Sequence, residues 1–127
     1  MMKILVVDDE PDVRMLFLQR FRKEIRAKEL ELVFAYSGEE ALDFLGDGNR
    51  ADVVLVLSDI NMPGMTGLEL LQRIKNQPPP LPVCMMTAYG SEAYQRAAED
   101  HGCEGYLTKP IDFAALKLRI RSLAAPG

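Results

Sequence analysis

A chain of 127 residues, of which 48% are hydrophobic and 27% charged, is long enough for one domain with its own core and too short for two ordinary ones. No apolar run approaches the roughly 20 residues that span a membrane, and the apolar start meets acidic residues too early for a signal peptide. The net charge of −4 and the lack of a lysine or arginine block argue against direct nucleic-acid binding by this domain. We therefore expect one cytoplasmic domain, residues 1–127, that contacts neither membrane nor nucleic acid.

The first strand and helix are predicted at the N-terminus. Residues 3–7 form a short apolar run typical of a strand, and Pro11 stands where the first turn of a helix tolerates proline. The helix is expected from about residue 11 to 27, with one face on a sheet formed by Val13, Leu16, Phe17, Phe21 and Ile25. Met15 and Leu18 lie outside this stripe, which indicates more apolar surface than one buried face needs.

The next two strands lead to the centre of the predicted sheet. Residues 31–35 indicate a strand, and Ser37 with Glu40 forms a capping box that opens a short helix. Five consecutive aliphatic residues, 53–57, are typical of a central parallel strand covered on both faces, and this strand ends at Asp59.

The second half of the chain repeats the alternation of helix and strand. The expected elements are a helix that follows the 63–67 loop with Leu68, Leu71 and Ile74 on one side, a strand at 82–86, a helix at 92–100 capped by Ser91, a strand at 104–108, and a helix capped by Asp112. Strands that alternate with helices throughout imply right-handed crossovers and a parallel sheet with helices on both faces. The predicted fold is therefore a doubly wound α/β domain.

Polar residues end the predicted strands. Because parallel strands end at one edge of a sheet, one crevice is expected to hold Asp8, Asp9, Asp59, Thr87 and Lys109. Three carboxylates and one ammonium leave a charge of −2 there. Two carboxylates about 4 Å apart repel by roughly 4 kcal/mol at an effective dielectric of about 20, so a divalent cation is expected. All-oxygen ligands favour a hard ion such as Mg²⁺, or Mn²⁺.

Each of these residues also has a purely structural interpretation. Asp8 and Asp9 could cap a helix, and so could Thr87. Lys109 could simply lie in solvent. Together, a cation, a lysine and a hydroxyl around the Asp59 carboxylate are the parts that stabilise a transferring phosphoryl group, and aspartate itself can accept one.

The two cysteines carry no predicted role. Cys84 and Cys103 have neither a second pair nor a Cys-x-x-Cys spacing, so buried free thiols are expected rather than a disulfide or metal site.

Five stretches of the chain, in this order and at these separations, resemble the receiver domain of two-component response regulators. The resemblance covers essentially the whole chain and rests on residues 4–10, 37–42, 59–67, 86–90 and 105–111. It implies a flavodoxin-like five-stranded parallel sheet in the order 2-1-3-4-5.

The resemblance also implies a role for each acid. Asp59 would accept a phosphoryl group from a histidine kinase or a histidine phosphotransfer protein. Asp9 and Asp59 would bind Mg²⁺ directly, with the backbone carbonyl of Asn61, and Asp8 would act mainly through water. A domain of this kind is not an enzyme, although it promotes its own phosphorylation and dephosphorylation.

Other residues would read and time the signal. Lys109 would pair with the phosphoryl charge, and the peptide bond that follows it is expected to be cis. Thr87 would hydrogen-bond the phosphoryl group, and Tyr106 would turn inward when Thr87 moves. Asn61 and Tyr89 lie where side chains can screen attacking water, so they are expected to tune the phosphoryl lifetime.

The signal is expected to leave through the helix at 92–100, the strand at 104–108 and the last helix. The expected partners on this surface are a downstream protein, a fused output domain, or a second copy in a phosphorylation-dependent homodimer.

Three alternatives compete with this interpretation. A flavodoxin-like cofactor binder would need its first loop to cradle a phosphate, which the acids after the first strand would repel. A haloacid-dehalogenase-like phosphatase would be expected to carry a second aspartate where this chain has Asn61. A receiver that docks partners without phosphorylation would retain the same site, so only a phosphorylation assay separates it.

Overall fold

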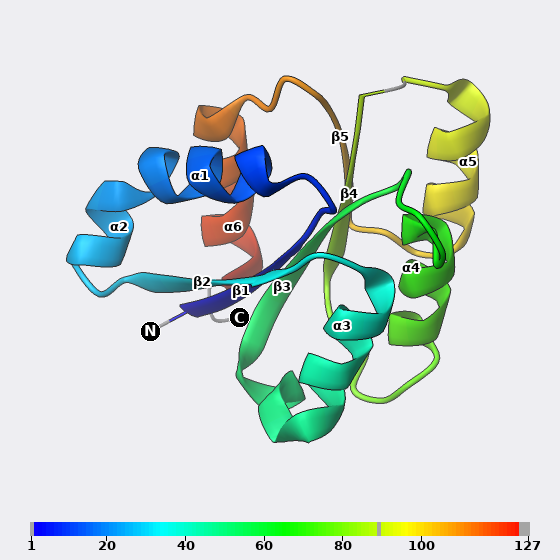
Figure 1. Ribbon diagram of the computed structural model, residues 1–127, viewed down its shortest axis with the longest axis horizontal. Helices are drawn as coiled ribbons and strands as arrows, with labels where there is room; N and C mark the ends of the chain where they lie inside the picture. Colours follow the sequence, from blue (N-terminus) through cyan, green and yellow to red (C-terminus); the bar gives the residue numbers. More distant parts are fainter. Residues whose placement is uncertain (1, 89, 125–127) are drawn as a thin grey trace.

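A computed structural model describes residues 2–88 and 90–124, which form a five-stranded parallel sheet in the order β2-β1-β3-β4-β5. Helices cover both faces of this sheet (Figure 1). The strands are β1 (Met2–Val7), β2 (Leu30–Ala35), β3 (Val53–Asp59), β4 (Val83–Thr87) and β5 (Gly105–Thr108). The predicted doubly wound α/β fold and its strand order are confirmed.

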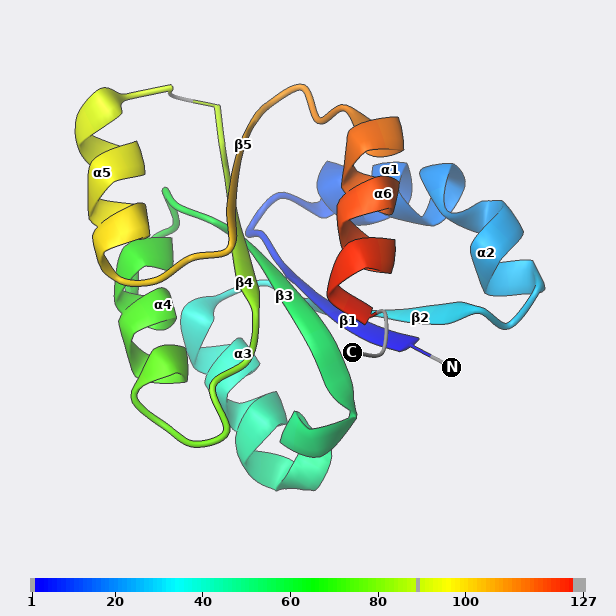
Figure 2. The ribbon, with the colours of Figure 1, turned by 180° about the vertical axis from the view of Figure 1, so that it is seen from behind.

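The helices form two layers, one on each face. They are α1 (Pro11–Arg20), α2 (Arg22–Arg26), α3 (Gly38–Phe44), the short η1 (Leu45–Asn49) and η2 (Arg50–Asp52), α4 (Gly67–Lys75), α5 (Glu92–Asp100) and α6 (Phe113–Ala124). Helices α1 and α6 lie on one face of the sheet, and α3, α4 and α5 lie on the other (Figures 1 and 2). Within residues 2–88 and 90–124, no helix has both the length and the apolar character needed to cross a membrane.

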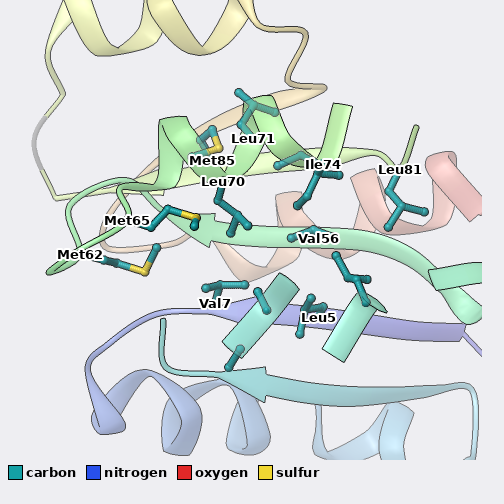
Figure 3. Close-up of a cluster of buried hydrophobic side chains, with 14 of the residues drawn as sticks. Leu5, Val7, Val56, Met62, Met65, Leu70, Leu71, Ile74, Leu81 and Met85 are labelled. Carbon is teal, nitrogen blue, oxygen red and sulfur yellow. The ribbon is translucent and has the colours of Figure 1, made fainter. Parts of the chain in front are cut away.

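The core under α3 and α4 comes from alternate residues of the central strands. Leu5 and Val56 point to this side and meet Leu70 and Ile74 of α4 (Figure 3). Of the predicted apolar side of this helix, Leu71 and Ile74 are fully buried and Leu68 is half-buried, and Leu70 is fully buried as well. Two methionines of the loop after β3 complete the same cluster, so this loop is anchored in the core.

The opposite core is built around three phenylalanine rings. Phe17 lies in α1 and Phe21 directly follows that helix, and their rings stack with centroids 5.9 Å apart. Phe113 of α6 packs edge-on against the two rings, with centroid distances of 5.2 and 6.0 Å. The predicted single helix over 11–27 is interrupted at this point. Phe21 has φ −103° and ψ 15°, which ends α1 and starts α2. The prediction of one continuous helix was wrong, because the spacing of apolar residues does not reveal a turn at a residue whose ring is buried.

Helix α1 exposes more apolar side chains than the sequence predicted. Met15 and Leu18 are exposed, and so is Leu16, which was expected on the buried stripe. Successive helical residues are about 100° apart around the axis, so a helix that buries Phe17 turns its neighbour Leu16 outward. The buried face of α1 is therefore narrower than the apolar periodicity indicated.

The predicted caps agree with the structure, and the predicted cysteines agree in part. Ser37 and Ser91 each accept a hydrogen bond from a backbone N–H of the helix that follows, at 3.1 and 3.4 Å. Asp112 does the same for α6 at 3.1 Å. Cys84 is a buried free thiol, as predicted, whereas Cys103 is free but only half-buried and precedes β5.

Candidate functional site

The carboxyl ends of the central strands bring the predicted acids together. Carboxylate oxygens of Asp8, Asp9 and Asp59 all lie within 4.8 Å of one another. Two of these acids line a cleft of about 250 Å³, whose lining residues are Asp9, Glu10, Asp59, Asn61, Ala88 and Lys109. Loops β1–α1 and β3–α4 form two walls of this cleft, and the loop after β5 brings in the lysine.

Asp59 is the last residue of β3, and the end of the strand fixes its carboxylate. The backbone N–H of Ile60 donates to Asp59 Oδ1 at 2.9 Å, and also lies 3.1 Å from the carbonyl of Met86 in β4. Only 7% of the Asp59 side chain is exposed. The carboxylate is therefore held at the edge of the sheet with little water around it.

Gly67 packs closely against the backbone of Asp59 and Ile60. A Cβ at Gly67 would lie 2.0 Å from the Asp59 carbonyl oxygen and 2.8 Å from the Cα of Ile60. The Gly67 N–H donates to the Ile60 carbonyl at 2.8 Å, so the start of α4 packs directly against the end of β3. From the sequence, Gly67 was predicted only as part of a turn. Its position shortly after Pro63 and Gly64 was the available signal, but the close approach itself depends on the fold.

Lys109 pairs with two acids at unequal distances. Its Nζ lies 2.8 Å from Asp8 Oδ2 and 3.7 Å from Asp59 Oδ2, and its backbone N–H donates to the Thr87 carbonyl at 2.7 Å. The bond from Lys109 to Pro110 is cis, as expected. Burial acts to lower the pKa of Lys109, but the hydrogen bond to Asp8 and the nearby carboxylates outweigh it, so the pKa is raised. Lys109 is therefore charged and bound chiefly to Asp8.

The Asp59 carboxyl has a strongly altered acidity. Burial, and after it the Asp8 carboxylate, raise the pKa of Asp59 from 3.8 to about 6, although Lys109 opposes the rise. The loss of hydration and the crowding of like charge both favour the neutral acid. One lysine does not offset this cluster, which leaves it attractive to a further cation.

The donor set fits a hard divalent cation. Asp8, Asp9 and Asp59 offer only oxygen atoms, and the cleft-lining residues include neither histidine nor cysteine. Oxygen ligands suit Mg²⁺ and Mn²⁺ rather than the softer metals. The arrangement can therefore hold such an ion beside a buried carboxylate and a lysine.

The remaining predicted residues lie around this cleft with different degrees of contact. Thr87, the last residue of β4, is fully buried and pairs in register with Thr108 of β5. Tyr106 lies opposite Met85 and packs, half-buried, against the core under α5, where burial raises the pKa of its phenol. Tyr89 lies outside the described residues.

Comparison with known proteins supports one family. A family model described as the response regulator receiver domain matches residues 4–121. The chain is 34% identical to response regulator RppA of Synechocystis sp., over 96% of the chain and 50% of RppA. It is 39% identical to the transcriptional regulatory protein GlrR of Escherichia coli K12, over 89% of the chain and 24% of GlrR. The chain thus spans about half the length, or less, of these curated relatives.

Solved structures give the same result. Response regulator TrrA of Thermotoga maritima, in complex with Mg(2+)-BeF, has a TM-score of 0.79 and 34% identity over 97% of this chain and 99% of that one. A chain of the CheX-CheY-BeF3-Mg complex from Borrelia burgdorferi has a TM-score of 0.84 and 26% identity, covering 98% of this chain and 90% of that one. This chain belongs to the response regulator receiver domain family.

Proposed function

We propose that Asp59 is the phosphoryl acceptor of this receiver domain, and that a histidine kinase or a histidine phosphotransfer protein is the donor. The observation that carries the proposal is the buried Asp59 carboxylate, held in a cleft beside Lys109 and two further carboxylates. The alternative of a phosphatase has no support from the family, and a receiver that works without phosphorylation is an outcome of the test below.

In the proposed transfer, a carboxylate oxygen of Asp59 attacks phosphorus as the bond from phosphorus to the donor's imidazole nitrogen breaks. The imidazole leaves with that electron pair, and an acyl phosphate remains on Asp59. The attacking carboxyl must be ionised, and with a pKa of about 6 Asp59 is mostly ionised at neutral pH. Lys109, 3.7 Å from Asp59 Oδ2, is near enough to turn from Asp8 to the new phosphoryl charge.

The proposed metal ligands come from the same cleft. Asp9 and Asp59 would bind Mg²⁺, or Mn²⁺, directly with the Asn61 carbonyl, and Asp8 would contribute mainly through water. When bound, the ion supplies positive charge that offsets the carboxylates and the incoming phosphoryl oxygens. Asp8 meanwhile keeps Lys109 oriented toward the cleft through their 2.8 Å ion pair.

The proposed switch joins Thr87 and Tyr106. The phosphoryl group adds close to two negative charges and three acceptor oxygens, and the hydroxyl of Thr87, at the cleft end of β4, would bond one of them. Movement of Thr87 would let Tyr106 turn inward and change the surface of α5, β5 and α6. A downstream protein, a fused output domain or a second copy of the chain would recognise that surface.

Asn61 and Tyr89 are proposed to tune how long the phosphoryl group survives. Asn61 lines the cleft, where its side chain can screen attacking water. Equal dephosphorylation rates in wild type and Tyr89→Ala would remove Tyr89 from this role. The expected cytoplasmic location stays a prediction.

The test is incubation with acetyl phosphate and Mg²⁺, followed by intact-mass measurement. Wild type is expected to gain one phosphoryl mass and Asp59→Asn none, because the amide is not a nucleophile of this kind. Asp100→Asn, an exposed site on α5, is the matched control and should be phosphorylated normally. An equal gain in wild type and Asp59→Asn would sink the proposal, and no gain in either would favour the unphosphorylated docking module.

The switch has its own experiment. In the beryllofluoride complex, Thr87→Ala should weaken the NMR shift at Tyr106 while leaving Asp59 phosphorylatable, since a ligand moves an equilibrium only as far as it favours one state. The same Tyr106 shift in wild type and variant would refute this route.

A further inference from the structure

Basic residues are concentrated in one helical layer of an otherwise acidic domain. Residues 11–28 and 113–124 contain nine basic and two acidic residues, whereas the rest of the chain contains six basic and seventeen acidic residues. Eight of these nine basic residues belong to α1, α2 and α6, which lie together on one face of the sheet (Figure 2), and the ninth, Lys28, follows α2. The chain therefore carries net charge −4 with a strongly positive face.

Five of these cations converge on a concave surface. A cleft of about 630 Å³ is lined by Gln19, Arg20, Arg22, Lys23, Arg26 and Lys117. No acidic or aromatic side chain is among them. The helix break at Phe21 separates the cations of α1 from those of α2, so that they border a hollow against α6 instead of following one helical line.

Two of the cations are held over aromatic rings beneath the cleft. The Arg20 guanidinium lies 5.7 Å from the centre of the Phe113 ring, and Lys117 Nζ lies 5.2 Å from that of Phe21. Such contacts restrict the side chains at little cost to their charge. The cleft thus has a partly preformed set of donors on a rigid aromatic core.

Glu24, an acid of α2, is already engaged by one of these cations. Glu24 accepts an ion pair from Lys117 at 2.9 Å. Arg20, Arg22, Lys23 and Arg26 form no ion pair with any acidic side chain in the described part of the chain. Like charges four residues apart, as at Arg22 and Arg26, destabilise a helix by a few tenths of a kcal/mol, so the fold itself gains nothing from this arrangement.

We propose that this cleft binds a compact phosphate polyanion. Guanidinium groups match phosphate oxygens with paired N–H donors, and three of the five cations are arginines. A hollow of this size suits a small molecule, and without an aromatic wall it recognises charge and not a nucleobase. The site uses none of the Asp59 cleft residues, so it is independent of the proposed phosphoryl transfer.

The experiment is calorimetric titration of the 127-residue chain with sodium tripolyphosphate, in metal-free buffer at about 50 mM salt. One binding site is expected, and Arg22→Gln/Arg26→Gln should weaken it by about tenfold or more. The matched control is Arg73→Gln/Arg96→Gln, which removes the same charge from exposed positions of α4 and α5 and should change affinity by less than about twofold.

Three results would overturn the proposal. They are no binding to wild type, an equal loss in both double variants, and binding of a duplex DNA probe without binding of tripolyphosphate, which would mark a nucleic-acid surface instead. NMR supplies a second measurement on the same samples. Amide shifts should move at residues 19–26 and at Lys117, and shifts confined to the Asp59 cleft would contradict the assignment.

Discussion

The acidic cleft and the basic cleft of this domain are two clusters of like charge in opposite environments. In the acidic cleft, the side chains of Asp8 and Asp59 are only 2% and 7% exposed. In the basic cleft, Arg20, Arg22 and Arg26 are all exposed. Ionised groups within 4.8 Å interact by about 3 to 4 kcal/mol at an effective dielectric of about 20, but by about 1 kcal/mol in water.

The difference in burial gives the two clusters different consequences. Burial and the Asp8 carboxylate together raise the pKa of Asp59 to about 6, which ties its charge to protons and cations near neutral pH. Water screens the cations of the basic cleft, so their crowding costs the fold little. The comparison predicts large effects on stability at the acidic cleft and small ones at the basic cleft, and four changes test it.

The largest effect is expected from Gly67→Ala. The added Cβ would lie 2.0 Å from the Asp59 carbonyl oxygen, and because that atom is backbone it cannot move aside without distorting the end of β3. We expect a loss of more than about 3 kcal/mol in the free energy of unfolding, measured with urea. Gly46→Ala is the control, since nothing lies within 4 Å of its Cβ position, and it should be neutral or stabilising. Equal losses in the free energy of unfolding for both variants would mean that the backbone around Asp59 can move to accept the added methyl group.

Asp59→Asn should stabilise the metal-free protein at neutral pH by roughly 3 kcal/mol, the equivalent of a pKa raised from 3.8 to about 6. Because the folded pKa lies above the unfolded one, the stability contributed by the protonated carboxyl is fully present below about 3.8 and is lost as pH rises through about 6. The advantage of the amide should therefore be large at pH 7.5 and small near pH 4 in urea titrations. A difference that stays constant with pH would show that packing, not charge, is responsible.

Some of the features behind these stability effects could be predicted from the sequence, and others could not. The strands and most helices were predictable because apolar periodicity and caps are local, and parallel strands gather their ends at one edge. That edge identified Asp8, Asp59 and Lys109 together. The preference of Lys109 for Asp8, at 2.8 Å against 3.7 Å, depends on the path of a loop and was not predictable.

The unpredicted features all require contacts between distant segments. Gly67 approaches the backbone of Asp59 only after the loop between them folds back. The basic cleft combines residues 19–26 with Lys117. Because these residues are far apart in the sequence, no continuous basic block indicates the cleft. The turn at Phe21 lies where its ring packs against Phe113, which belongs to the last helix.

Magnesium should relieve the charge of the acidic cleft. At about a hundredfold excess over its Kd, an ion that binds only the folded state adds about 2.7 kcal/mol to the free energy of unfolding. We expect this gain in wild type and its near loss in Asp9→Ala, measured by thermal unfolding with and without MgCl₂. Asp12→Ala removes the same charge from an exposed position of α1 and should keep the gain. An unaltered gain in Asp9→Ala would show that Asp9 is not a ligand.

The smallest effect is expected in the basic cleft itself. Arg22→Gln/Arg26→Gln removes a like-charge pair spaced four residues apart on α2, and neither side chain is buried or ion-paired in the described structure. We expect the free energy of unfolding to rise by no more than about 0.5 kcal/mol at low salt, and the gain to vanish at about 1 M salt, where charges are screened over about 3 Å. Urea titrations at the two salt concentrations measure both values. A loss of more than about 1 kcal/mol at either salt concentration would mean that these arginines hold the fold together, and the contrast with the buried acids would then fail.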